Sequence, residues 1–141
     1  MASLLDGFPM SRSFQCQSGL VLVADDDPLL VMLLEHRLAA AGFRVIAAPD
    51  GAAARARIAR DTPEFLILDS MMPVMGGAEV LRRLQIDGRP AGMKIIMLTT
   101  LSMERHVVSV LKLGAADFLA KPFSPDELVA RIERLSMDRA A

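Results

Sequence analysis

Strand-like segments alternate with helix-like segments along nearly the whole chain, and this alternation restricts the possible folds more than any single motif. The order strand–helix–strand predicts a parallel sheet, joined by right-handed crossovers and covered by helices on both faces. Most of the strand-like segments are short apolar runs bounded by turn residues, as in buried strands. The segment 43–47 alternates only weakly and suits a sheet edge. The five predicted strands are Leu20–Ala24, Phe43–Ala47, Phe65–Leu68, Lys94–Leu98 and Asp117–Ala120.

Five helices are predicted between and after these strands. Asp27 followed by Pro28 is a capping carboxylate before a proline at the first helical position, and Gly42 suits the end of that helix. The segment 124–127, Ser-Pro-Asp-Glu, is a capping box for the last helix, whose apolar stripe ends at Leu135. The other three helices are predicted over Gly51–Arg60, over Ala78–Leu84, and from Ser102 to the residue before Gly114.

The chain of 141 residues is predicted to form one α/β domain. Residues 1–19 have no helical or strand period and are interpreted as a flexible N-terminal tail. Residues 20–137 form the domain, and residues 138–141 a C-terminal tail. No repeat, linker or low-complexity segment divides the domain.

Composition excludes several classes of function. The net charge of −1 gives no electrostatic indication of nucleic-acid or anionic-membrane binding. No uncharged apolar run reaches the length of about 18 residues that a membrane span needs. The single cysteine, Cys16, cannot form an internal disulfide, which is compatible with a reducing cytoplasm. We therefore expect a cytoplasmic protein.

Polar residues follow four of the five predicted strands. They are the acidic triplet Asp25-Asp26-Asp27, then Asp69, Thr99-Thr100 and Lys121. The carboxyl ends of parallel strands meet at one edge of a sheet, where open α/β folds place their ligands. Taken singly, each of these residues is explained equally well as an ordinary turn residue or helix cap. Because four such strand ends share one edge, we expect these side chains to converge on Asp69.

The chemistry of this set points to phosphoryl transfer. A cluster of carboxylates needs a cation, and carboxylate-rich oxygen ligation with open positions suits Mg²⁺. Lys121 can supply a positive charge, and the Thr99 hydroxyl can donate a hydrogen bond. A carboxylate nucleophile, Mg²⁺, a lysine and a hydroxyl together are what transfer of a phosphoryl group to an aspartate requires.

Four segments resemble the signature blocks of the response-regulator receiver domain of two-component signalling. They are VLVADDDP, LILDSMMPVMGG, IIMLTT and GAADFLAKPF, and they occur in the family's order at family-like intervals. The resemblance spans about Leu20 to Leu135. It implies a flavodoxin-like (βα)5 three-layer sandwich with strand order 2-1-3-4-5, like a single-domain chemotaxis regulator.

The resemblance also implies roles for individual residues. Asp69 would accept the phosphoryl group from a phosphohistidine on a histidine kinase or a histidine phosphotransfer protein. Asp25 and Asp26 would hold Mg²⁺ together with Asp69 and the backbone carbonyl of Met71, which leaves Asp27 mainly as a helix cap. Such a domain is not a general enzyme, because it catalyses only its own phosphorylation and dephosphorylation.

The remaining family positions concern signalling. Thr99 would bond one phosphoryl oxygen and Lys121 another, with Lys121-Pro122 as the family's cis peptide. Thr99 and Phe118 would form the switch. Its output would be a face made by the Ser102–Leu113 helix, the fifth strand and the Ser124–Leu135 helix, which would bind a downstream protein or a second copy of the chain. Two positions depart from the family pattern: Thr100 stands where a smaller residue is commoner, and Phe118 lacks the hydroxyl of a tyrosine.

Two alternative functions remain. A pseudo-receiver would keep the fold as a binding module without phosphorylation. A phosphohydrolase resembling the haloacid dehalogenase family would use Asp25 as its nucleophile, since Asp25 and Asp27 form an acid-x-acid pair after the first strand. The chain is short for such a hydrolase, and no second acid pair appears late in the sequence.

Overall fold

The computed structural model describes residues 17–100 and 111–138. Five parallel strands form one sheet in the order β2-β1-β3-β4-β5, as the resemblance implies. The strands are β1 (Gln17–Ala24), β2 (Arg44–Ala48), β3 (Pro63–Asp69), β4 (Lys94–Thr99) and β5 (Asp117–Ala120). The helices within the described ranges are α3 (Pro28–Ala40), α4 (Gly51–Asp61), α5 (Gly77–Asp87) and α7 (Pro125–Asp138).

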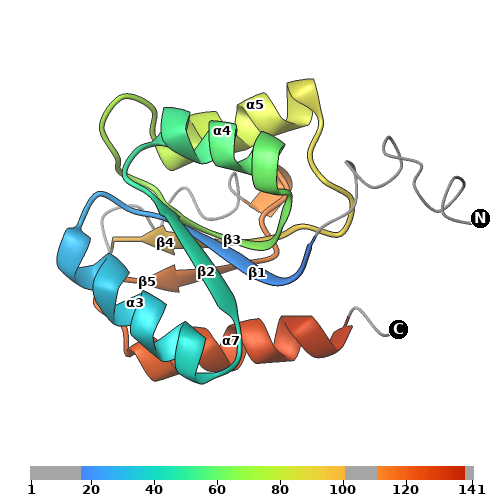
Figure 1. Cartoon of the computed structure of the whole chain (residues 1–141). Helices are drawn as coiled ribbons and strands as arrows, with labels where there is room; N and C mark the ends of the chain where they lie inside the picture. The colour runs from blue at the N-terminus through green and yellow to red at the C-terminus, as the bar shows by residue number, and fades with distance from the viewer. Residues whose placement is uncertain (1–16, 101–110, 139–141) are drawn as a thin grey trace, which may run out of the picture.

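The helices cover both faces of the sheet, so the molecule has three layers (Figure 1). Helices α4 and α5 lie on one face, and α3 and α7 lie on the other. Because successive side chains of a strand point to opposite faces, each central strand contributes to two separate cores. The predicted three-layer α/β architecture is therefore confirmed.

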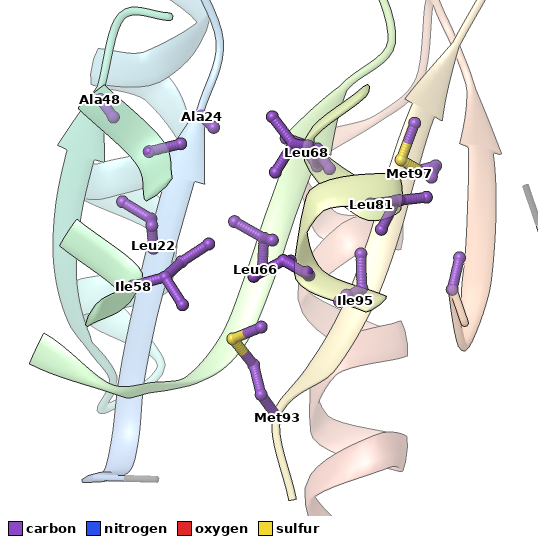
Figure 2. Packing of buried hydrophobic residues seen from close by; sticks show 14 residues of the cluster. Leu22, Ala24, Ala48, Ile58, Leu66, Leu68, Leu81, Met93, Ile95 and Met97 are labelled. Atoms are coloured by element: carbon purple, nitrogen blue, oxygen red, sulfur yellow. The ribbon is translucent and has the colours of Figure 1, made fainter. Parts of the chain in front are cut away.

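The core under α4 and α5 contains alternate residues of the central strands. Figure 2 shows Leu22, Leu66 and Ile95 lying side by side across the sheet, with Ile58 of α4 and Leu81 of α5 packed over them. All five of these side chains are buried. This packing fixes the two helices whose N-terminal ends lie near the carboxyl edge of the sheet.

The core under α3 and α7 takes the intervening residues. Val21, Phe65 and Ile96 point to this face, where Leu34 of α3 and Leu128 of α7 meet them. Every residue of β3 is buried, as a central strand covered on both faces requires. Substituting a leucine of such a core with alanine typically costs about 2–5 kcal/mol.

The predicted N-cap residues of α3 and α7 are in place, although the Glu127 side chain of the predicted capping box pairs with Arg131. The Asp27 side chain accepts hydrogen bonds from the backbone N–H groups of Leu29 and Leu30, and Pro28 occupies the first turn of α3. At the start of α7, the Ser124 hydroxyl accepts from the Asp126 N–H at 3.2 Å. Of the helix predicted from Ser102 to Leu113, residues 111 and 112 are helical, Leu113 lies in a turn, and residues 102–110 lie outside the described residues.

The first strand begins at Gln17, earlier than Leu20, so residues 17–19 belong to the sheet rather than to a tail. The Gln17 N–H donates to the carbonyl of Thr62 at 2.8 Å. The Gly19 N–H donates to the buried carboxylate of Glu64 at 2.7 Å. This extension is held by polar hydrogen bonds, which hydrophobic patterning does not detect. At the other end of the domain, α7 continues to Asp138.

No helix in the described part of the chain combines the length and apolar character needed to cross a bilayer.

Candidate functional site

The carboxyl edge of the sheet brings together side chains from the ends of four strands. Asp25 directly follows β1, Asp69 is the last residue of β3, Thr99 is the last residue of β4, and Lys121 directly follows β5. The chain passes from β1 to β2 on one side and then returns to β3 on the other. Asp25 and Asp69 therefore flank the point where the strand order reverses, which is where open α/β sheets bind ligands.

Three carboxylates form the centre of this site. Asp25, Asp26 and Asp69 each offer an oxygen, and these atoms lie within 4.8 Å of one another. Asp25 and Asp69 are buried, at 2% and 4% exposure, whereas Asp26 is exposed to solvent. One Asp25 oxygen also accepts a hydrogen bond from the Asp27 N–H at 2.9 Å, which fixes the carboxylate relative to the start of α3.

Lys121 contacts both buried acids. Its Nζ lies 2.9 Å from Oδ2 of Asp25 and 3.3 Å from Oδ1 of Asp69. The backbone N–H of Lys121 donates to the backbone carbonyl of Thr99 at 2.6 Å. The Lys121-Pro122 peptide bond is cis. The Lys121 side chain thus crosses the end of β4 and contacts the acids at the ends of β3 and β1.

The protonation behaviour reflects this crowding. Burial, followed by repulsion from Asp25, raises the pKa of Asp69 above its ordinary value of 3.8, although Lys121 and a hydrogen bond from the Met71 backbone act in the opposite direction. Burial alone would lower the pKa of Lys121. The hydrogen bond to Asp25 and the charge of Asp69 outweigh that effect and raise it. Repulsion from Asp25 thus persists at Asp69 despite the nearby lysine.

Two buried hydroxyls adjoin the carboxylates without a hydrogen-bond partner in the described part of the chain. They are Oγ1 of Thr99 and Oγ of Ser70. Thr99 was a predicted site residue, whereas Ser70 was not; its only signal in the sequence is its place directly after Asp69. A buried hydroxyl without a partner is uncommon and is often explained by a functional role.

The loop from Ser70 to Gly77 follows Asp69 closely. The Ser70 N–H donates to the Leu98 carbonyl at 2.9 Å. The Gly77 N–H donates to the Ser70 carbonyl at 3.2 Å, which closes the loop. The carbonyl of Met71 is a predicted metal ligand. The Met71 backbone N–H donates to the Asp69 carboxylate, and the Met71 side chain is exposed. The structure thus places the Met71 backbone at Asp69.

Phe118, the predicted switch ring, lies in β5 at some distance along the strand from Lys121. It pairs with Met97 in the sheet register, while Ala120 pairs with Thr99. The ring is half-buried against the core under α4 and α5. Most of the helix predicted to share its output face lies outside the described residues.

The described residues supply what a magnesium ion needs. Three carboxylate oxygens converge, one of them from the exposed side chain of Asp26, so the cluster is open toward solvent. Burial and repulsion from Asp25 both raise the pKa of Asp69, so a bound cation would relieve part of this repulsion. Mg²⁺ prefers such oxygen donors and keeps several waters, so an open carboxylate cluster fits it.

A hollow of about 390 Å³ lies beside Lys121, between the first turns of α3 and the segment 121–123. Leu29 and Leu33 of α3 line it and are exposed, as is Met32 on the same helix. A second hollow of about 380 Å³, between α4 and the C-terminal end of α5, lies away from the carboxylates. Only the first adjoins the site.

Comparison with known proteins agrees with the fold. The sequence model for the response regulator receiver domain matches residues 21–133. Among curated proteins, the transcriptional regulatory protein GltR of Pseudomonas aeruginosa is 44% identical over 115 residues, which is 82% of this chain and 48% of GltR. The DNA-binding response regulator MtrA of Mycolicibacterium smegmatis is 40% identical over 112 residues, covering 79% of this chain and 48% of MtrA. The chain spans less than half the length of these relatives.

Solved structures of the same shape are also known. The receiver domain of the Francisella response regulator 1452 superposes with a TM-score of 0.79 at 30% identity, covering 86% of this chain and 99% of that one. The Vibrio cholerae chemotaxis protein CheY4 gives a TM-score of 0.76 at 30% identity, with coverage of 84% and 99%.

Proposed function

The chain belongs to the response-regulator receiver-domain family, and from this premise we propose that it accepts a phosphoryl group on Asp69 in a two-component phosphorelay. The donor is a phosphohistidine on a histidine kinase or a histidine phosphotransfer protein. The observation that carries the proposal is the contact of Lys121 with Asp69 beside the Asp25–Asp26–Asp69 cluster. A pseudo-receiver does not require this complete arrangement.

The proposed roles follow from charge and reach. Asp69 is the nucleophile, and Asp25, Asp26, Asp69 and the Met71 carbonyl would hold Mg²⁺, which neutralises charge on the phosphoryl oxygens. Lys121 stabilises another of those oxygens, because its ammonium group already lies 3.3 Å from the nucleophile. The Thr99 hydroxyl donates to a third, a role supported by its burial without a partner. The chain promotes only its own phosphorylation and dephosphorylation.

A protein donor is supported by the surface beside the site. Leu29, Met32 and Leu33 of α3 are 61%, 57% and 46% exposed. Leu29 and Leu33 line the hollow next to Lys121, opposite the segment 121–123. Exposed apolar side chains grouped on one helix are typical of protein contacts. We place the donor there, in the cytoplasm, with no membrane or nucleic-acid contact.

The output is proposed to depend on Thr99 and Phe118. A phosphoryl group can shift an equilibrium only through contacts that differ between two states. Movement of Thr99 toward the phosphoryl oxygen would vacate space beside β4, and the Phe118 ring in β5 is placed to fill it. The changed face, made by the 102–113 segment, β5 and α7, would bind a downstream protein or a second copy of the chain.

The phosphoacceptor is tested with a small donor and mass spectrometry. Wild-type protein treated with acetyl phosphate and Mg²⁺ should gain one phosphoryl group, mapped to Asp69. The Asp69→Asn variant should gain none, whereas Asp126→Asn, an exposed acid on α7, should behave as wild type. An unmodified wild-type chain would indicate a pseudo-receiver, and an adduct on Asp25 would indicate the hydrolase.

The switch is tested separately with the phosphoryl mimic beryllofluoride. Backbone amide NMR shifts of Phe118 and α7 should change on binding in wild type and change far less in Thr99→Ala. Equal changes in both proteins would exclude this coupling and leave the phosphoacceptor assignment untouched.

A further inference from the structure

The start of α4 lies directly against the loop that follows Asp69. Gly51, the first residue of α4, is buried, and a Cβ atom built on it would lie 2.2 Å from the carbonyl oxygen of Met75 and 2.7 Å from the Met75 Cβ. Real Cβ atoms essentially never come this close to another heavy atom, and the nearest partner is backbone rather than a flexible side chain. Only glycine at position 51 permits this approach.

Both ends of the loop are fixed independently of Gly51. The Ser70 N–H is held by Leu98 in β4, and the Gly77 N–H closes the loop onto the Ser70 carbonyl. A Cβ on Gly77 would lie 2.5 Å from the Asp69 carbonyl oxygen, so α5 begins in contact with the end of β3. A displacement at Met75 must therefore be taken up by the residues between these ends, which include Met71.

The middle of the loop has an unfavourable backbone conformation. Val74 has a φ of 68°, in the left-handed region that a β-branched residue rarely adopts. The Met75 N–H donates to the Pro73 carbonyl at 2.7 Å, a three-residue turn centred on Val74. Val74 itself is 81% exposed, so its own side chain contributes little packing. A strained turn persists only where its surroundings enforce it.

We propose that Gly51 is a positioning residue for the phosphoryl-accepting site. By lacking a Cβ it lets α4 support the Met75 backbone, and this support holds the strained turn and the Met71 backbone in place beside Asp69. Gly51 touches neither the phosphoryl group nor the cation, and it acts only through the loop. The inference rests on the proposed function for its consequence, but the loop geometry that it predicts is measurable without phosphorylation.

The test compares Gly51→Ala with Gly88→Ala. Gly88 ends α5 with a φ of 91° and has no heavy atom within 4 Å of an added Cβ. The control therefore suffers backbone strain from the same substitution without touching the loop. Because the chain has no tryptophan or tyrosine, amide NMR is the probe. Shifts are recorded for 70–77 without metal, and Mg²⁺ is then titrated.

In Gly51→Ala we expect displaced amide shifts over 70–77 without metal, and a Kd for Mg²⁺ raised about ten- to a hundredfold, as when an outer partner of a metal ligand is lost. Gly88→Ala should keep the wild-type shifts and Kd. Wild-type amide shifts and a wild-type Kd in a folded Gly51→Ala protein would overturn the proposal. An equal loss of Mg²⁺ affinity in both variants would also overturn it. If Gly51→Ala does not fold, Met75→Gly is used instead: it removes the Met75 Cβ that faces Gly51 and frees the backbone of the turn, and a wild-type Kd for Mg²⁺ in that variant would overturn the proposal equally. Failure of wild type to bind Mg²⁺ would instead count against the proposed function.

Discussion

Lys121 lies closer to Asp25 than to the proposed nucleophile: its Nζ is 2.9 Å from an Asp25 oxygen and 3.3 Å from an Asp69 oxygen. Lys121 therefore serves first as the counter-charge of buried Asp25, a proposed Mg²⁺ ligand. A cation held by Asp25 would compete with the lysine for this carboxylate and would leave Lys121 available to the phosphoryl group. This order of contacts leads to a prediction about stability.

Lys121→Met should destabilise the metal-free protein at pH 7 by about 2 kcal/mol, in the range for hydrogen bonds between charged groups. The loss should stay below the 3–5 kcal/mol of a fully buried pair, because the lysine side chain is 25% exposed. Urea unfolding in EDTA measures it, with the exposed Lys112→Met as control. Since the pKa of Lys121 is raised in the folded state, its contribution is complete below the ordinary value near 10.5 and fades as the pH rises through the folded pKa.

Asp69→Asn should stabilise the metal-free protein at neutral pH. The folded state raises the pKa of Asp69, so it binds the Asp69 proton more tightly than the unfolded chain does. Wild-type stability therefore falls as the pH rises from the ordinary value near 3.8 through the folded pKa. The two proteins should differ least below pH 3.8 and most above the folded pKa. Urea midpoints across this range measure the difference; a midpoint gap independent of pH would contradict the assignment.

Thr99→Val should raise the free energy of unfolding by about 1 kcal/mol. The substitution removes a buried hydroxyl that has no partner in the described residues, and such a group costs about 1–3 kcal/mol. Thr99→Ser keeps the hydroxyl and should give no such gain. Urea unfolding of the metal-free proteins distinguishes the two; equal or lower stability of the valine variant would show that Oγ1 is satisfied in solution.

Asp26→Asn should raise stability in EDTA by about 1 kcal/mol or less, because Asp26 is exposed and its repulsion with Asp25 and Asp69 is screened by water. With Mg²⁺ in excess the order should reverse, since wild type gains the binding free energy that the variant has lost. Asp27→Asn is the matched control, because asparagine keeps the helix cap. Thermal unfolding with and without Mg²⁺ shows the reversal.

Acetyl phosphate should not modify any of these proteins in excess EDTA.

The sequence was informative wherever a residue's role depends on strand position. Asp25, Asp69, Thr99 and Lys121 could be grouped in advance because parallel strands end at one edge, and the structure places them there. Hydrophobic period and caps also predicted α3 and α7 well. These signals are local, so a single sequence contains them.

Contacts between distant loops could not be predicted in the same way. Gly51 and Met75 meet only because α4 and the loop after β3 pack together, and neither residue has a local pattern that indicates this. The start of β1 at Gln17 depends on hydrogen bonds to Thr62 and to the side chain of Glu64 through Gly19. Such relationships depend on the three-dimensional packing of polar or small residues, which the periodicity of apolar residues does not indicate.

The ion pair between Asp25 and Lys121 joins residues 96 positions apart. During synthesis the acidic side chains therefore emerge well before their counter-charge, and a nascent chain that ends before β5 carries the carboxylates without it. The contact therefore cannot form until β5 and Lys121 have been made. Under the proposed function, competence for phosphorylation would therefore be acquired only once the chain has been made and folded through β5, and a kinase would find no incomplete substrate to modify.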